Sequence, residues 1–106
     1  MPFLEVNNLE PRQMLPGCIA RFVHADNMTI SYWDLEPGAV IPNHSHPHEQ
    51  VSSVIRGELE LTVGGETRLL GPGGVAIVGS NVEHSVNALS ECYVIDAFYP
   101  VREDYR

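Results

Sequence analysis

The feature that most constrains this chain is the absence of any helical pattern in its 106 residues. No segment repeats apolar residues at helical spacing over three turns, whereas short alternating or β-branched runs recur between clusters of Gly, Pro and Asn. We therefore expect an all-β fold, with strands near residues 18–24, 28–35, 50–55, 58–63, 66–70, 75–78, 84–89 and 92–98. So many strands in so short a chain suit a closed barrel or a two-sheet roll, and we expect residues 1–106 to form a single domain.

Glycine clusters mark the turns between these runs. Gly64 and Gly65 stand between two alternating segments, which is the two-residue signal of a tight hairpin whose positive φ angles glycine tolerates. Residues 36–38 and 71–74 combine Pro with Gly and predict two further turns.

The charge composition excludes several classes of function. Six basic residues oppose 14 acidic ones, which gives a net charge of −8, and lysine is absent. The sequence therefore has no basic patch for nucleic acid, and Schiff-base chemistry on a lysine is ruled out.

The N-terminus and the cysteines bear on location. The first eleven residues, MPFLEVNNLEP, are acidic where a secretion signal is basic, and no apolar run is long enough for a membrane span. Cys18 and Cys92 lie outside any C-x-x-C motif. We expect a cytoplasmic protein with two reduced, buried thiols and no membrane partner.

Four of the five histidines fall in two short segments, NHSHPHEQ and NVEHS. If the first segment is extended, His44 and His46 point to the same face, because side chains alternate along a strand. Two convergent imidazoles suit a first-row divalent metal. The alternative is a solvated polar loop.

The spacing around these histidines is distinctive: Gly38-x5-His44-x-His46-x3-Gln50-x6-Gly57. It resembles the first motif of the cupin superfamily, G-x5-H-x-H-x3-E-x6-G, with glutamine in place of glutamate.

The second cupin motif, G-x5-P-x-G-x2-H-x3-N, is matched less completely. Gly73 and His84 agree with it, Gly79 and Asn81 stand in place of Pro and Gly, and Asn87 falls one position early.

The resemblance implies an all-β, double-stranded β-helix (jelly-roll) barrel with one divalent transition metal ion (Ni, Zn, Mn or Fe) bound by His44, His46, Gln50 and His84. A neutral Gln50 ligand leaves the charge of the ion uncompensated and favours Lewis-acid chemistry over redox chemistry. The alternative for Gln50 is a solvent-facing strand residue.

The last strand carries one acid among apolar residues. Asp96 and Phe98 share a face, and a carboxyl that faces a barrel interior is costly unless it is paired or functional. Arg102 follows the turn at Pro100 and could grip a carboxylate through two hydrogen bonds. A structural ion pair between Asp96 and Arg102 is the alternative.

Together, HSHPHEQ and Asp96-x-Phe98-x3-Arg102 resemble the KdgF family, the small cupins of pectin and alginate breakdown. The resemblance covers residues 32–104. It implies a metal-dependent enzyme that converts 4,5-unsaturated uronate monosaccharides to linear ketonised sugars, with these three residues as its catalytic residues. Asp96 would move the proton, Phe98 would pack on the sugar ring and Arg102 would hold the carboxylate of this small anionic substrate. A metal-dependent dioxygenase and a non-catalytic sugar-binding cupin are the alternatives.

The N-terminal segment bears on assembly. Residues 3–6 are apolar enough to add a strand but have no hairpin partner in the sequence, and exposed sheet edges need cover. We therefore expect a homodimer.

Overall fold

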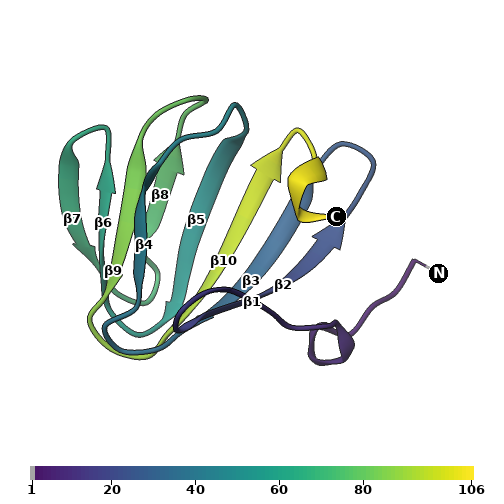
Figure 1. The fold of residues 1–106 in the computed structure, drawn as a ribbon, viewed down its shortest axis with the longest axis horizontal. Helices are drawn as coiled ribbons and strands as arrows, with labels where there is room; N and C mark the ends of the chain where they lie inside the picture. Colours follow the sequence, from purple (N-terminus) through teal and green to yellow (C-terminus); the bar gives the residue numbers. More distant parts are fainter. Residues whose placement is uncertain (1) are drawn as a thin grey trace.

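The computed structural model describes residues 2–106 and consists of two antiparallel sheets that face one another (Figure 1). One sheet has six strands in the order β1-β2-β3-β10-β5-β8, and the other has four in the order β4-β9-β6-β7. The strands are β1 (Arg12–Leu15), β2 (Cys18–His24), β3 (Thr29–Leu35), β4 (Val40–His44), β5 (Glu49–Arg56), β6 (Leu59–Val63), β7 (Glu66–Leu70), β8 (Val75–Val78), β9 (His84–Ala88) and β10 (Cys92–Tyr99). Two short 3-10 helices, η1 (Val6–Asn8) and η2 (Glu103–Tyr105), lie near the ends of the chain.

The all-β expectation is confirmed, and all eight expected strands form, three of them with the expected bounds. Two strands, β1 and β4, were missed. Strand β1 is a four-residue edge strand, too short to show an alternating pattern. Strand β4 contains Pro42, which cannot donate a backbone hydrogen bond and is tolerated because β4 is also an edge strand.

The core lies between the sheets and follows the two-residue period of the strands. In β3, Thr29, Ser31, Trp33 and Leu35 are buried while the residues between them are partly exposed, and β10 repeats the pattern. The side chains of Trp33, Leu35, Val54, Leu59, Leu61 and Val94 belong to one packed apolar cluster. Burying such side chains contributes about 1.5–3 kcal/mol each and holds the sheets face to face.

The predicted hairpin is confirmed. Strands β6 and β7 pair up to Val63 and Glu66, so Gly64 and Gly65 form a two-residue loop, and both have positive φ angles of 56° and 85°. At the corner where the chain leaves β5 for the other sheet, Gly57 has φ +87°, and a Cβ there would overlap the carbonyl oxygen of Glu91. The hairpin loop and the corner at Gly57 therefore both require glycine.

The N-terminal segment forms no strand within the single chain. Residues 3–6 do not form a strand: residues 2–5 have no regular structure, and η1 begins at Val6. Figure 1 shows it running away from the sheets. None of the helices described in residues 2–106 is long and apolar enough to cross a membrane.

Candidate active site

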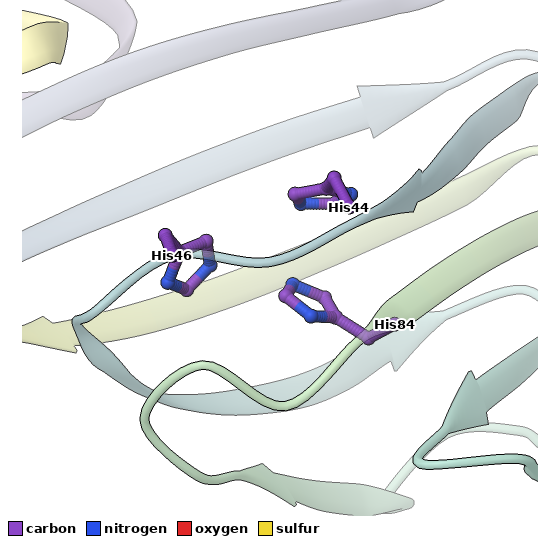
Figure 2. A group of neighbouring side chains, drawn as sticks. All are labelled: His44, His46 and His84. Carbon is purple, nitrogen blue, oxygen red and sulfur yellow. The ribbon is translucent and has the colours of Figure 1, made fainter.

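The three motif histidines come together between the sheets. Figure 2 shows the rings of His44, His46 and His84 gathered around one point, and one nitrogen of each lies within 4.8 Å of the others. Strands β4 and β9 place His44 directly opposite His84, with ring centroids 4.2 Å apart. The β4–β9 register shifts between Ile41 and His44, and such an irregularity re-aims the side chains beside it.

His46 reaches the cluster from a loop and not from a strand. The expectation that one extended strand carries both His44 and His46 is wrong, because β4 ends at His44, but the two imidazoles still converge on one point. The loop that carries His46 is fixed from outside, since the backbone N–H of Asn81 donates to the His46 carbonyl at 2.8 Å. Asn81 has φ 62° at the position where the cupin motif has glycine, and asparagine tolerates this conformation.

The three imidazoles share one hydrogen-bonding arrangement. In each of His44, His46 and His84, Nδ1 lies 2.8–3.0 Å from the backbone carbonyl oxygen of a residue two positions away. A carbonyl only accepts, so each Nδ1 carries the proton and each Nε2 presents a lone pair. Nε2 of His84 is buried and has no hydrogen-bond partner within residues 2–106. In metal sites, a hydrogen bond of this kind fixes the ring orientation of a histidine and the tautomer that leaves Nε2 free to bind the ion.

Two of the histidines are held neutral. Burial, together with the charge of Arg102 and the neighbouring His84, lowers the pKa of His46 to about 4. Burial also lowers the pKa of His84, although its hydrogen bond to the Val82 carbonyl opposes the change. A neutral imidazole is the form that binds a metal ion.

Gln50 joins this group from the opposite sheet. Its Nε2 donates to Ser52 Oγ at 2.9 Å and to Asp96 Oδ2 at 3.2 Å, which fixes the amide and directs Oε1 toward His46. Oε1 lies 3.0 Å from His46 Nε2. Since the His46 proton is on Nδ1, two lone pairs face each other at this distance. A cation between them would turn this repulsion into ligation, so the donor set fits a metal ion bound at ~2.1 Å from each donor.

The side chain of Gln50 is only 7% exposed and faces the interior. The alternative that Gln50 is a solvent-facing strand residue is therefore wrong. The residues Glu49 and Val51 on either side of it are the exposed ones.

Asp96 is the buried acid of the site. Burial is the main reason that its pKa is raised to about 6, although the nearby Ser52 hydroxyl and the charge of Arg102 oppose the rise. Its Oδ2 accepts from Gln50, but Oδ1 is buried without a hydrogen-bond partner among the described residues. A carboxyl with an unpaired oxygen and a pKa this close to neutral pH is suited to proton transfer.

Arg102 does not pair with Asp96, so the alternative of a structural ion pair between them is not realised. Its guanidinium instead donates from Nε and Nη2 to the two oxygens of Asp104, at 3.0 and 2.8 Å. The same group lies 4.7 Å above the ring of Phe98 and 4.0 Å above that of Tyr105. Asp104 and Tyr105 had not been singled out from the sequence. The only available signal was their place directly after Arg102.

These groups, apart from Asp104, line one cavity between the sheets. Its lining combines polar side chains, Ser52 among them, with apolar side chains of the core. The residues expected from the sequence that line it are His44, His46, Gln50, His84, Asp96, Phe98 and Arg102. Tyr105 also lines it, from η2. His48 does not; it is half-buried, and its carbonyl oxygen accepts from His46 Nδ1.

Comparison with known proteins agrees with this geometry. Residues 31–98 match the family model described as a cupin domain. The chain is 37% identical over 83 residues to the pectin degradation protein KdgF of Dickeya dadantii, covering 76% of each protein. This chain is a KdgF-type cupin. Among solved structures, KdgF from a Halomonas species superposes on this cupin with a TM-score of 0.94 at 28% identity, covering 100% of this chain and 99% of that one.

A second solved structure, an RmlC-like cupin from Shewanella frigidimarina, gives a TM-score of 0.95 at 26% identity and covers 100% of this chain and 96% of the other. The cupin fold predicted from the histidine spacing is confirmed by both superpositions. The two-sheet roll and the position of the histidine cluster between its sheets follow from that fold.

Proposed function

We propose that this cupin is a metal-dependent enzyme that converts 4,5-unsaturated uronate monosaccharides, released by pectin or alginate lyases, to linear ketonised sugars. The observation that carries the proposal is one cavity that combines a buried carboxyl and a guanidinium with three imidazoles that lie close enough to bind one metal ion. The 37% identity to a pectin degradation protein supports the same class of substrate.

His44, His46, Gln50 and His84 would hold one divalent transition metal ion. All four donors are neutral, so the ion would keep its full charge and supply Lewis-acid polarisation of a sugar oxygen. The backbone carbonyls behind each histidine fix the rings before any ligand arrives.

Arg102 is suited to hold the carboxylate of the sugar. Two of its donor groups bind Asp104, while Nη1 has no hydrogen-bond acceptor in the part of the chain that the structure describes. The protein carries a net charge of −8, so long-range attraction does not bring an anionic sugar to the site. The local positive charge of Arg102 must therefore supply this recognition. Phe98 lies beside it and offers an apolar surface to the sugar ring.

Asp96 is suited to move the proton. Ring opening breaks the bond between C1 and the ring oxygen, while the anomeric hydroxyl loses its proton and C1 becomes an aldehyde. The ring oxygen remains on C5 as an enol, which becomes a ketone when C4 gains a proton. The net change moves one proton from the anomeric oxygen to C4, with no oxidation. A carboxyl with a pKa of about 6 can accept and return a proton near neutral pH.

The deciding experiment follows the ultraviolet absorbance of the conjugated alkene of an unsaturated monouronate. Adding the metal-loaded protein should accelerate its loss, and Asp96→Asn should abolish most of the acceleration. Oxygen uptake on substrate addition would instead indicate a dioxygenase. Sugar binding without any loss of absorbance would indicate a non-catalytic binding cupin.

A further inference from the structure

Arg102 uses only part of its hydrogen-bonding capacity within the protein. A guanidinium carries one N–H on Nε and two on each Nη, all in one plane. Nε of Arg102 donates to Asp104 Oδ1 at 3.0 Å, and Nη2 donates to Asp104 Oδ2 at 2.8 Å. These two bonds occupy one side edge of the group. The end edge keeps one N–H of Nη2 beside one N–H of Nη1, and this pair can bind a second carboxylate through two parallel hydrogen bonds.

The guanidinium lies between Asp104 and the cavity. The Arg102 side chain is only 7% exposed and lines the cavity. The Asp104 side chain is 55% exposed and does not belong to the cavity lining within residues 2–106. Asp104 therefore binds Arg102 from the solvent side, and a ligand reaches the unused end edge from the cavity.

Two aromatic rings also contact the guanidinium. The rings of Phe98 and Tyr105 meet edge to face with centroids 6.0 Å apart, and Cζ of Arg102 lies 4.7 Å from the first centroid and 4.0 Å from the second. Such cation–π contacts restrain the plane of the group. The Tyr105 ring is itself held, since it packs 4.6 Å from the Phe22 ring and its backbone carbonyl accepts from Arg12. Strands β1 and β2 thus fix this aromatic wall of the cavity.

The backbone of Arg102 is anchored as well. Its N–H donates at 2.9 Å to Oγ1 of Thr29, a residue that is fully buried in β3. Both ends of the side chain are therefore ordered within the folded protein. A free arginine would lose rotamer freedom when it binds a carboxylate, whereas here most of that loss has already occurred on folding.

The rings leave one freedom that Asp104 removes. A ring contact tolerates rotation of a guanidinium within its own plane, because the π surface has no fixed acceptor atom, whereas two hydrogen bonds to one carboxylate fix that rotation. Hydrogen bonds from Arg102 lower the pKa of Asp104, although burial opposes the change, so this carboxylate is ionised near neutral pH. Asp104 thus decides which edge of Arg102 faces the cavity.

The negative charge of Asp104 opposes the binding of an anion only weakly. More than half of the Asp104 side chain is in contact with water, so its charge is screened from a ligand on the other edge of the guanidinium. Its two hydrogen bonds to Arg102, in contrast, are direct. When the charge of Asp104 is removed, the loss of orientation should therefore outweigh the relief of repulsion.

We propose that Asp104 is a positioning residue that holds Arg102 so that the end edge of the guanidinium, through Nη1 and Nη2, binds the carboxylate of a uronate. The identity of this ligand rests on the proposed function. The C-terminal turn η2 then belongs to the substrate-recognition site, although Asp104 itself contacts neither the sugar nor the metal ligands.

Steady-state kinetics of the metal-loaded protein give the first test. Asp104→Asn keeps the shape of the side chain but has one acceptor oxygen and no charge, so it should raise the KM for an unsaturated monouronate about tenfold with kcat little changed. Asp104→Glu keeps the charge and should restore part of the loss. Glu103→Gln is the matched control, because Glu103 belongs to the same turn but pairs with Arg106; its KM should equal that of the wild type.

Calorimetry with galacturonate and its methyl ester gives the second test and needs no turnover. Asp104→Asn should bind galacturonate roughly tenfold more weakly than the wild type does, whereas the uncharged ester should bind both proteins equally. A defect in folding would weaken both ligands alike. In the Arg102→Ala background, Asp104→Asn should have no further effect on galacturonate, because the two residues act as one unit.

The outcomes separate this proposal from the proposed reaction. A wild type that binds galacturonate but does not turn over an unsaturated monouronate ends the reaction, and the proposal then stands or falls on the Kd of Asp104→Asn. An unchanged Kd and KM, or equal losses for galacturonate and its ester, would reduce Asp104 to a structural role and overturn the proposal. A lower Kd would overturn it too, because Asp104 would then compete with the ligand for Arg102. A wild type with neither binding nor turnover would overturn both.

Discussion

Replacing the buried acid by asparagine separates its proposed use in proton transfer from its effect on stability. Burial raises the pKa of Asp96 to about 6 from an ordinary 3.8. Between these values the folded protein keeps a proton that the unfolded chain has released, so the free energy of unfolding falls as the pH rises. At ~1.4 kcal/mol for each tenfold change in acidity, the full loss above the higher pKa is about 3 kcal/mol.

Asparagine does not titrate and therefore avoids this loss. Its carbonyl can still accept from Gln50, but its amide group must occupy the position of Oδ1, which has no partner, at a cost of ~1 kcal/mol. In metal-free protein above pH 7, Asp96→Asn should therefore be more stable by about 2 kcal/mol, which raises Tm by roughly 8 °C or more. The same substitution should reduce turnover by the metal-loaded protein at least ~100-fold.

Scanning calorimetry of chelator-treated protein between pH 4 and pH 8, with ~1 pH unit steps, checks this prediction. The gain in Tm should shrink toward the acid end, where the unfolded chain also begins to take up the proton. Glu60→Gln, at an exposed position of β6, is the control and should change Tm little at any pH. The reasoning is refuted if Asp96→Asn melts at or below the wild type at pH 8, or if its gain does not depend on pH.

Four further outcomes are expected. Gln50→Glu should keep about one metal ion per chain by elemental analysis but slow turnover, since glutamate adds negative charge to the ligands; a faster enzyme would contradict the Lewis-acid argument. Metal at 100 times its Kd should stabilise the wild type by ~2.7 kcal/mol and His84→Ala much less, and equal gains in Tm would remove His84 from the ligand set. Arg102→Ala should weaken uronate binding by ~1.5–3 kcal/mol, with Arg102→Lys recovering only part, whereas full recovery would contradict a two-pronged contact. Gly57→Ala should lower the unfolding free energy by more than ~1 kcal/mol in denaturant titration, and a neutral effect would contradict the close approach to Glu91.

The parts of the fold predicted from the sequence are those set by local rules. The Gly64-Gly65 hairpin follows from two residues that accept positive φ, and the pairing of β6 with β7 follows from the alternation on either side. The inward positions of Asp96 and Phe98 follow from the same two-residue period. These features need no knowledge of distant contacts.

The features that were missed depend on contacts distant in sequence or made outside strands. Strand β4 resembles a loop because Pro42 interrupts it, and only its pairing with β9 makes it a strand. The direction of His46 is set by a hydrogen bond from Asn81, 35 positions further along the chain. Asp104 lies in a 3-10 turn, whose three residues carry no periodic signal, and its role appears only when Arg102 is seen to bind it.

The position of the candidate ligands between the two sheets has a mechanical consequence. His44 and His84 belong to the four-stranded sheet and Gln50 to the six-stranded one, while no strand of one sheet pairs with a strand of the other in residues 2–106. A bound ion would therefore crosslink the two sheets, which are otherwise joined only by core packing and by chain connections. The two sheets would separate less often as the metal concentration rises, because the metal binds only the closed arrangement. The lifetime of this protein against proteases would then report how much metal its surroundings supply.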